Sequence, residues 1–252
     1  MSDHEATGTV FFIDMRNFTL LCSKMSGYSA EDSVIEKGMT QYDMRLEFLI
    51  NVMAQFYDEW LGILNENMER GKISNAIFQS TGDGIMIAVE GKLHYLTAFE
   101  ASIAMAHQIR KKLDQEINPK LKKLGINRLE DQMDFGIGMC SGQFKYVEVP
   151  YTLNGAYINS NDSPDIKSKG TYMTILGTAP NYAARIEQAN KDHCDSYIMI
   201  AESTVYLLCE HYGIPFDDPV QIQNKLKLQY LWKHRFRGIS EIGLYIRLVH
   251  GF

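Results

Sequence analysis

The sequence predicts an α+β protein in which helices pack against a mainly antiparallel sheet. Two observations lead to this prediction. Short β-branched and aromatic runs alternate with longer stretches of helical period, and several of the runs come in pairs joined by short polar turns. The 252 residues, of which 45% are hydrophobic, can bury the core of one elaborated domain, so we expect a single domain over 1–252.

The first elements are a strand, a long helical region and a hairpin. The run TVFFIDM at 9–15 predicts a buried strand that ends at an acidic residue. Residues from about 30 to 70 carry an apolar stripe at helical spacing, which predicts one long helix or two consecutive ones; its members are Met44, Phe48, Met53, Phe56, Trp60 and Leu64. The runs ISNAIFQ and IMIAVE flank an Asp-Gly turn at 80–84, the strongest short-range signal of a β-hairpin.

The rest of the chain is also expected to alternate between strands and helices. A helix is expected over about 93–124, and a second hairpin from DFGIGM and QFKYVEV, joined at Cys140-Ser141-Gly142. Residues 150–170 are rich in Asn, Gly, Ser and Asp without period, which predicts a surface excursion. After it we expect strand 171–176, helix 179–190, strand 196–201, helix 202–212 and two final strands at 231–237 and 244–249.

Composition excludes several function classes. No segment offers the ~20 consecutive apolar residues of a membrane-spanning helix, and the polar N-terminus is no export signal, so we expect a cytoplasmic protein without a membrane partner. The four cysteines lack metal-site spacing, which argues against both zinc and a disulfide framework. A formal net charge of −6 argues against a nucleic-acid partner, because such binding needs many cationic contacts to phosphate.

Two acidic residues end neighbouring elements. Asp14 closes the first strand and Asp83 lies in the turn of the next hairpin. If the first strand is central in the sheet, these carboxylates meet at one end of it, where a hard divalent cation would relieve their repulsion. The alternative is purely structural: Asp14 caps a helical turn and Asp83 is an ordinary turn residue.

The sequence around these residues resembles the class III adenylate and guanylate cyclase family. FFIDMRNFT is similar to the family's opening strand-Asp motif, FQSTGDGIMIAV to its second metal hairpin, and ILGTAPNYAARIEQAN to its Gly-x-x-Val-Asn-x-Ala-x-Arg block. The three blocks occur in the family's order, and DFGIGMCSG fits between the second and the third. The resemblance spans roughly Gly8–Ala201 and implies a class III cyclase catalytic domain with a ferredoxin-like core.

The resemblance also implies roles for individual residues. Two Mg²⁺ or Mn²⁺ ions would be bound by Asp14, Asp83 and the backbone carbonyl of Met15. The substrate phosphates would lie on the loop of Asn17, Phe18 and Thr19, where orphan amides at a helix start favour anions. Asn17 stands where the family has Gly, but Asn tolerates the left-handed backbone that such a loop needs.

The third block would complete the site. Asn181 would orient the ribose and Arg185 would neutralise charge on the transferred phosphoryl group, one helical turn apart on the same face. In the family these two residues come from one protomer and the metal ligands from the other. The resemblance therefore implies a homodimer with shared sites that converts a nucleoside triphosphate into a 3′,5′-cyclic nucleotide and pyrophosphate.

The base-reading positions depart from the family. Gln79 stands where adenylate cyclases have Lys and guanylate cyclases have Glu, and its partner position is Thr174, which some bacterial adenylate cyclases share. Without either purine code, the chain resembles the stand-alone bacterial pyrimidine cyclases of antiphage (Pycsar) signalling, which make cyclic UMP or cyclic CMP for a separate effector. The alternative is an adenylate cyclase that makes cyclic AMP and tolerates Gln79.

Two other readings and one gap stay open. Diguanylate cyclases and polymerase palms also pair acids at strand ends, but the sequence lacks their Gly-Gly-Asp/Glu-Glu-Phe turn. A catalytically degenerate, nucleotide-binding regulatory domain usually loses a metal Asp or the Asn and Arg pair, and this chain keeps all four. No residue clearly matches the family's terminal-phosphate lysine; the cations weighed for that role are Lys167, Lys169, Lys233, Arg235 and Arg237.

Overall fold

A single mixed sheet organises the molecule. The computed structural model describes residues 4–18, 20–21, 41–69, 75–123, 126, 128, 132–154, 167–191, 196–236 and 241–248. The strands are β1 (His4–Arg16), β2 (Asn75–Ser80), β3 (Gly84–Glu90), β4 (Asp134–Asn154), β5 (Lys167–Gly177), β6 (Ser196–Ala201), β7 (Leu228–His234) and β8 (Ile242–Leu248). The helices are α2 (Gln41–Glu69), α3 (His94–Lys112), the π-helical turn η1 (Leu113–Ile117), α4 (Asn118–Lys123), α5 (Thr178–Asn190), α6 (Glu202–Tyr212) and α7 (Pro219–Leu226).

The strand order is β2-β3-β1-β4-β6-β8-β7, and β5 pairs with β4 outside this path. All described pairings are antiparallel except the one between β4 and β6. The expected mainly antiparallel sheet with a central first strand is therefore confirmed. Because β1 lies between β3 and β4, Asp14 is opposite Gly84 on one side and Gly136 on the other.

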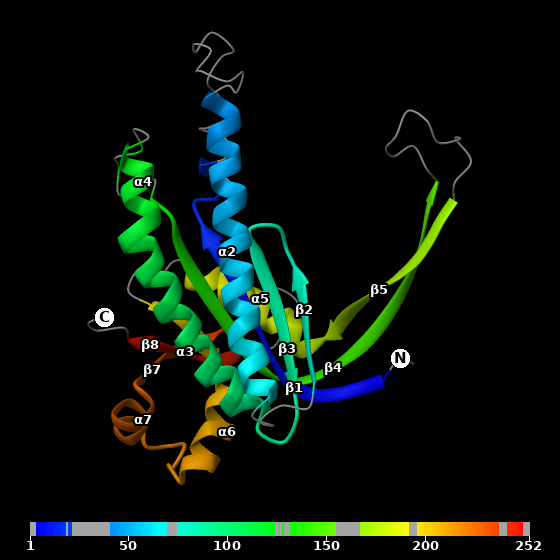
Figure 1. Ribbon diagram of the computed structural model, residues 1–252. Coiled ribbons are helices and arrows are strands. Elements are labelled where there is room, and N and C mark those ends of the chain that lie inside the picture. The colour runs from blue at the N-terminus through cyan, green and yellow to red at the C-terminus, as the bar shows by residue number, and fades with distance from the viewer. Residues whose placement is uncertain are drawn as a thin grey trace.

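Helices cover both faces of this sheet (Figure 1). Successive side chains of a strand point to opposite faces, and β1 follows this rule: Phe11, Ile13 and Met15 pack into the core under α2, α3 and α6. Val10 points the other way, into a second core that contains Ala183 of α5. The apolar stripe predicted for the long helix forms part of the first core through Met53, Phe56, Trp60 and Leu64; residues 30–40, where that helix was expected to begin, lie outside the described residues.

The second predicted hairpin is wrong. Residues 134–154 form one continuous strand, in which Cys140, Ser141 and Gly142 pair with Val10, Thr9 and Gly8 of β1. The buried Ser141 hydroxyl is satisfied within a strand, because it lies 2.7 Å from Thr9 Oγ1 of β1 and accepts from Thr204 Oγ1 of α6 at 2.9 Å.

The true hairpin partner of β4 is β5, with pairs from Phe144–Gly177 to Asn154–Lys167. The ends of the expected excursion at 150–170 are therefore strand, and its middle, 155–166, lies outside the described residues. In Figure 1 this hairpin curves away from the body of the protein as an arm.

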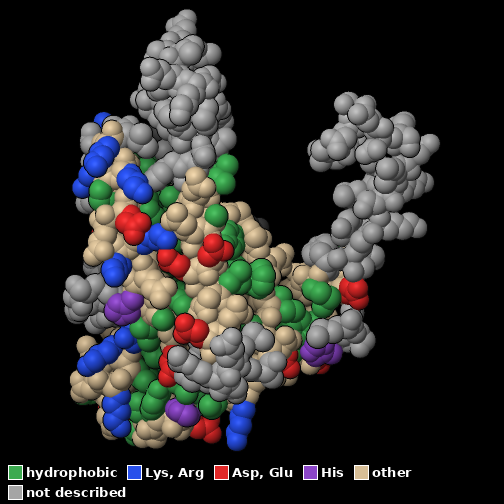
Figure 2. Space-filling model, viewed as in Figure 1, with side chains coloured by type: hydrophobic (Ala, Val, Ile, Leu, Met, Phe, Trp, Pro, Cys, Tyr) green, Lys and Arg blue, Asp and Glu red, His purple; other side chains and the backbone are tan. Residues whose placement is uncertain are grey.

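The surface adds little that points to other functions. Figure 2 shows Lys and Arg side chains over α4 and the adjoining end of α3, where acidic neighbours balance two of them: Arg110 pairs with Asp114 and Lys112 with Glu59. Cys140 and Cys209 are buried free thiols, and burial raises the pKa of Cys140 to about 11. Among the described helices, none has the length and apolarity to cross a bilayer.

Candidate active site

The two acidic residues of the metal motifs lie side by side at one end of β1 and β3. Asp14 is paired with Gly84 in the sheet, and the Met15 amide donates to the carbonyl of Asp83 at 3.1 Å. Glycine is required at 84, since a Cβ there would approach the Ile13 carbonyl to 2.4 Å and Asp14 Oδ1 to 3.0 Å. Asp14, Asp83 and the backbone of Met15 line one hollow of about 280 Å³, hereafter the carboxylate hollow.

A tyrosine from α2 contacts the hairpin of Asp83 from the other side. Tyr57 Oη donates to the Gly84 carbonyl at 2.6 Å and lies 2.8 Å from Ser80 Oγ. The turn itself depends on Gly82, which has a φ of +100°. Tyr57 was not predicted as a site residue, because one tyrosine on an amphipathic helix carries no distinguishing sequence signal.

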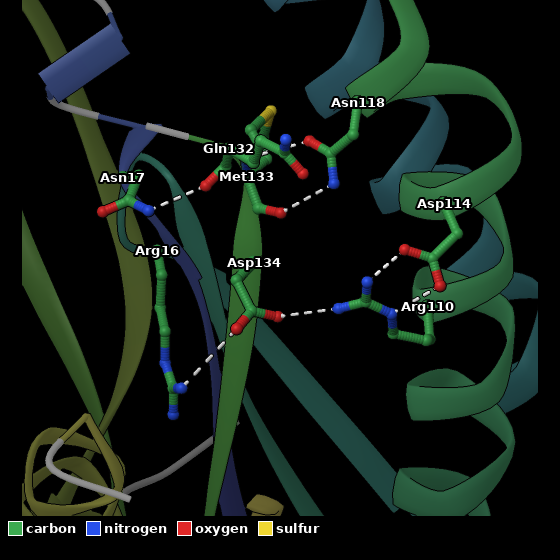
Figure 3. Close-up of polar contacts among 8 residues, drawn as sticks. All are labelled: Arg16, Asn17, Arg110, Asp114, Asn118, Gln132, Met133 and Asp134. Atoms are coloured by element: carbon green, nitrogen blue, oxygen red, sulfur yellow. Dashed lines mark hydrogen bonds and ion pairs between the residues drawn. The ribbon is translucent and has the colours of Figure 1, made fainter. Parts of the chain in front are cut away.

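Asn17 has the left-handed backbone expected where the family has Gly, with a φ of 66°. Its side chain is also bound: Nδ2 donates to the Gln132 carbonyl at 2.7 Å (Figure 3). The neighbouring Met133 is held by Asn118, which accepts from its amide at 3.0 Å and donates to its carbonyl at 3.1 Å. Phe18 follows in the carboxylate hollow, and Thr19 lies outside the described residues.

Arg16 turns away from the carboxylates toward β4. Its Nη1 lies 3.8 Å from Asp134 Oδ2, and Arg110 of α3 approaches the same carboxylate at 3.5 Å, as Figure 3 shows. Burial raises the pKa of Asp134 against the opposing effect of these two cations. Gly136 makes room for Arg16, because a Cβ there would lie 2.8 Å from Nη2.

Besides Arg16, the carboxylate hollow is lined by a second cation, Lys191, which directly follows α5. Lys191 Nζ donates to Asp14 Oδ2 at 2.7 Å and lies 3.7 Å from Glu187 Oε2 one turn earlier. Burial raises the pKa of Glu187 to about 7, and the Asp14 charge adds to this effect. Burial lowers the pKa of Lys191, but its hydrogen bond to Asp14 and the nearby carboxylates raise it overall. Neither residue was predicted as part of the site.

These residues fit a hard divalent cation. A lysine ammonium within hydrogen-bond distance of Asp14 indicates that this end of the sheet attracts positive charge. The described residues contain no cluster of three or more His, Cys, Asp or Glu side chains that could enclose a metal by themselves. Two carboxylates and a backbone carbonyl suit Mg²⁺ or Mn²⁺, which take their remaining ligands from water and substrate phosphates.

Asn181 and Arg185 lie on α5, which is packed closely on β4. A Cβ at Gly138 would approach the Glu187 amide nitrogen to 2.2 Å, so glycine brings the helix backbone against the strand. The buried Asn190 side chain donates to the Ile137 carbonyl at 3.3 Å and fixes the helix end. Arg185 Nε donates to Asn181 Oδ1 at 3.4 Å, so the two residues lie together on one face as predicted.

Gln79 and Thr174 also meet, although they come from β2 and β5. Thr174 Oγ1 donates to Gln79 Oε1 at 2.9 Å. Both line a second hollow of about 390 Å³ together with Asn181, and we call it the base hollow. Phe12 and Met86 contribute apolar surface to it.

The two hollows share no lining residue within the described part of the chain. Asn181 lies near the start of α5 and Lys191 just past its end. At 1.5 Å per residue these positions are about 15 Å apart along the helix axis. One chain therefore carries both halves of the predicted site but keeps them separate.

Solved nucleotide cyclases share this fold. The adenylyl cyclase CyaB from P. aeruginosa aligns with a TM-score of 0.59 at 16% identity over 100% of this chain and 98% of that chain. A bacterial light-regulated adenylyl cyclase gives 0.56 at 12% identity over 96% and 90%, and the guanylyl cyclase Cya2 gives 0.55 at 16% identity over 98% and 94%.

The predicted α+β fold of class III cyclases is thus confirmed. No protein-family model matches the sequence, and no curated protein is similar to it.

Proposed function

We propose that the protein is a class III nucleotide cyclase that uses two divalent metal ions. The observation that carries this proposal is the meeting of Asp14 and Asp83 at adjoining strand ends, on a fold shared with adenylyl and guanylyl cyclases. The presence of Asn181 and Arg185 on one face of α5 supports an active enzyme over a degenerate regulatory domain.

The active unit is a homodimer in which each site combines one chain's carboxylate hollow with the partner chain's base hollow. The separation of the two hollows within one chain supports this arrangement. Exposed apolar side chains beside the base hollow support it too: Phe78 is 53% exposed and Leu176 is 59% exposed. A second chain that covers them would remove about 25 cal/mol of unfavourable hydration per Å².

In this site the substrate's 3′-oxygen bonds to the α-phosphorus as the bond to the pyrophosphate oxygen breaks, and the hydroxyl proton is released to water. Metal ions held by Asp14, Asp83 and the Met15 carbonyl would supply activation of the 3′-hydroxyl and charge neutralisation at the leaving group. Amides from Asn17 onward would bind phosphate oxygens at a helix start. On the partner chain, Asn181 would hold the ribose and Arg185 would stabilise charge developing on the phosphoryl group.

The preferred substrate is a pyrimidine triphosphate, UTP or CTP, and the product is cyclic UMP or cyclic CMP. Gln79 and Thr174 carry no charge, and their mutual hydrogen bond supports a base pocket unlike either purine code. The cyclic nucleotide would then act as a second messenger in antiphage defence, read by a separate effector protein.

The test is direct. Purified protein is incubated separately with ATP, GTP, CTP and UTP in the presence of Mn²⁺, and products are identified by mass spectrometry. The proposal expects a cyclic pyrimidine nucleotide and pyrophosphate. Cyclic AMP as the main product would leave a cyclase but overturn the pyrimidine assignment, and no cyclic product from any of the four would overturn the cyclase.

A further inference from the structure

Lys191 lies in the carboxylate hollow but belongs to none of the sequence motifs described above. It follows the last residue of α5 directly, and its ammonium donates to Asp14 Oδ2 at 2.7 Å inside the carboxylate hollow. The Asp83 carboxylate also acts on it electrostatically. Lys191 is thus bonded to one proposed metal ligand and lines the same hollow as the other.

The arrangement of α5 explains why Lys191 reaches this position. Side chains of β1 alternate between faces, and Asp14 lies on the α5 side because Ile13 and Met15 point into the opposite core. Gly138 and Asn190 hold the end of α5 against β4, next to β1. The close packing of α5 on β4 therefore brings the lysine to the carboxylate.

A second acceptor lies within reach. Glu187 is one turn before Lys191, and its Oε2 is 3.7 Å from Nζ. The other oxygen, Glu187 Oε1, is buried without a hydrogen-bond partner among the described residues. The lysine side chain is 40% exposed, so it has room to move, whereas the Glu187 side chain is only 8% exposed.

We propose that Lys191 is an internal competitor of the divalent metal for Asp14: it neutralises the carboxylate in the metal-free protein and moves to Glu187 when metal binds. A metal ion on either oxygen of Asp14 would lie within a few ångströms of the ammonium, and like charges at that separation repel strongly. Metal entry therefore displaces the ammonium. The free energy of the Lys191–Asp14 bond is lost in this exchange and weakens metal binding by the same amount. This inference rests on the proposed function in one respect, the binding of metal at Asp14.

The test is to titrate nucleotide-free protein with Mn²⁺ and to measure the free ion by electron paramagnetic resonance. In Lys191→Met the competitor is lost, and the dissociation constant for Mn²⁺ should fall about fivefold, the factor expected of a partly exposed ion pair. Lys191→Arg keeps the charge and should bind Mn²⁺ like the wild type. Lys225→Met, an exposed lysine on α7, is the matched control for the change in net charge.

The possible outcomes distinguish a failure of the proposed competition from a failure of the proposed metal site. Equal or weaker Mn²⁺ binding by Lys191→Met, with Lys225→Met unchanged, would overturn the competition while the cyclase proposal stands. An Asp14→Asn protein should lose the titrated site; if it binds Mn²⁺ as well as wild type, or if wild type binds none, the metal site and the inference both fail.

A second variant tests the move to Glu187. Glu187→Gln preserves shape and removes the negative charge of the second acceptor, so it should weaken Mn²⁺ binding more in the wild-type background than in Lys191→Met. Circular dichroism checks that each protein is folded. An equal loss in both backgrounds would mean that the Glu187 charge acts on the metal directly and not through Lys191. That result would overturn the proposed move of Lys191 to Glu187.

Discussion

Thr174 on β5 donates a hydrogen bond to Gln79 on β2 at 2.9 Å, although the two residues are 95 positions apart in sequence. With Oε1 engaged, the Gln79 amide group can still donate, and both residues line the base hollow. The pair is thus a preformed polar wall and not two independent side chains.

This wall predicts a specific response to substitution. Gln79→Lys removes the acceptor of the bond from Thr174, whereas Gln79→Glu keeps an acceptor oxygen; both place a charge against the base, so turnover of the pyrimidine substrate should fall. Each misplaced buried group costs about 1–3 kcal/mol, up to roughly a hundredfold in rate. Rates with all four triphosphates, with dimer content checked by light scattering, measure it. Preference for ATP, and an unaltered ranking in Gln79→Ala, would show the pyrimidine assignment to be wrong.

The two carboxylates should be indispensable for turnover but not for folding. Asp14→Ala or Asp83→Ala removes a proposed metal ligand at the solvent-facing end of the sheet, where few core contacts are lost. Cyclic nucleotide formation should drop below detection while circular dichroism stays unchanged. Asp58→Ala, an exposed acid on α2, is the control and should keep full activity. Activity in either site variant would remove the two-metal hypothesis.

Asn17 should act as a positioning residue for the phosphate loop. Asn17→Ala loses the bond to the Gln132 carbonyl and strains a backbone with a φ of 66°, for a cost of about 1–3 kcal/mol. Asn17→Gly loses only the bond and should be the milder change. The stability measured by urea denaturation should fall in the order wild type, Asn17→Gly, Asn17→Ala. The substrate KM should rise in the same order. A KM that is unchanged in the Ala variant would separate this loop from substrate binding.

Most of the fold follows from local signals. The strand expected at 9–15 and the hairpin around Asp83 have strong patterns of apolar alternation and turn chemistry. The structure contains both, although the strand is longer than expected and runs through Asp14 to Arg16. Cys140-Ser141-Gly142 misled because small polar residues commonly form turns; here β1 pairs through them and Thr9 and Thr204 satisfy the serine. Helix α7 was missed, although Asp218 caps it and Pro219 opens it.

The site was predictable only where residues form motifs. Asp14, Asp83, Asn181 and Arg185 were singled out because they stand in blocks that resemble class III cyclase motifs. In the structure Asp14 and Asp83 line one hollow, and Asn181 and Arg185 lie on one face of α5. Lys191 depends on long-range packing: it meets a residue 177 positions away in sequence. No local pattern encodes such a contact.

The central claim is that two half-sites on one chain meet across a dimer, and mixing two inactive variants tests it most directly. Asp83→Ala lacks the carboxylate half and Arg185→Ala lacks the helix α5 half, so each homodimer should be inactive. A mixed dimer contains one site with neither substitution, and an equal mixture after subunit exchange should regain about a quarter of wild-type turnover, since half the dimers are mixed and each has one intact site of two. Exchange is verified with differently tagged chains. No recovery in dimers shown to have exchanged would contradict the shared site.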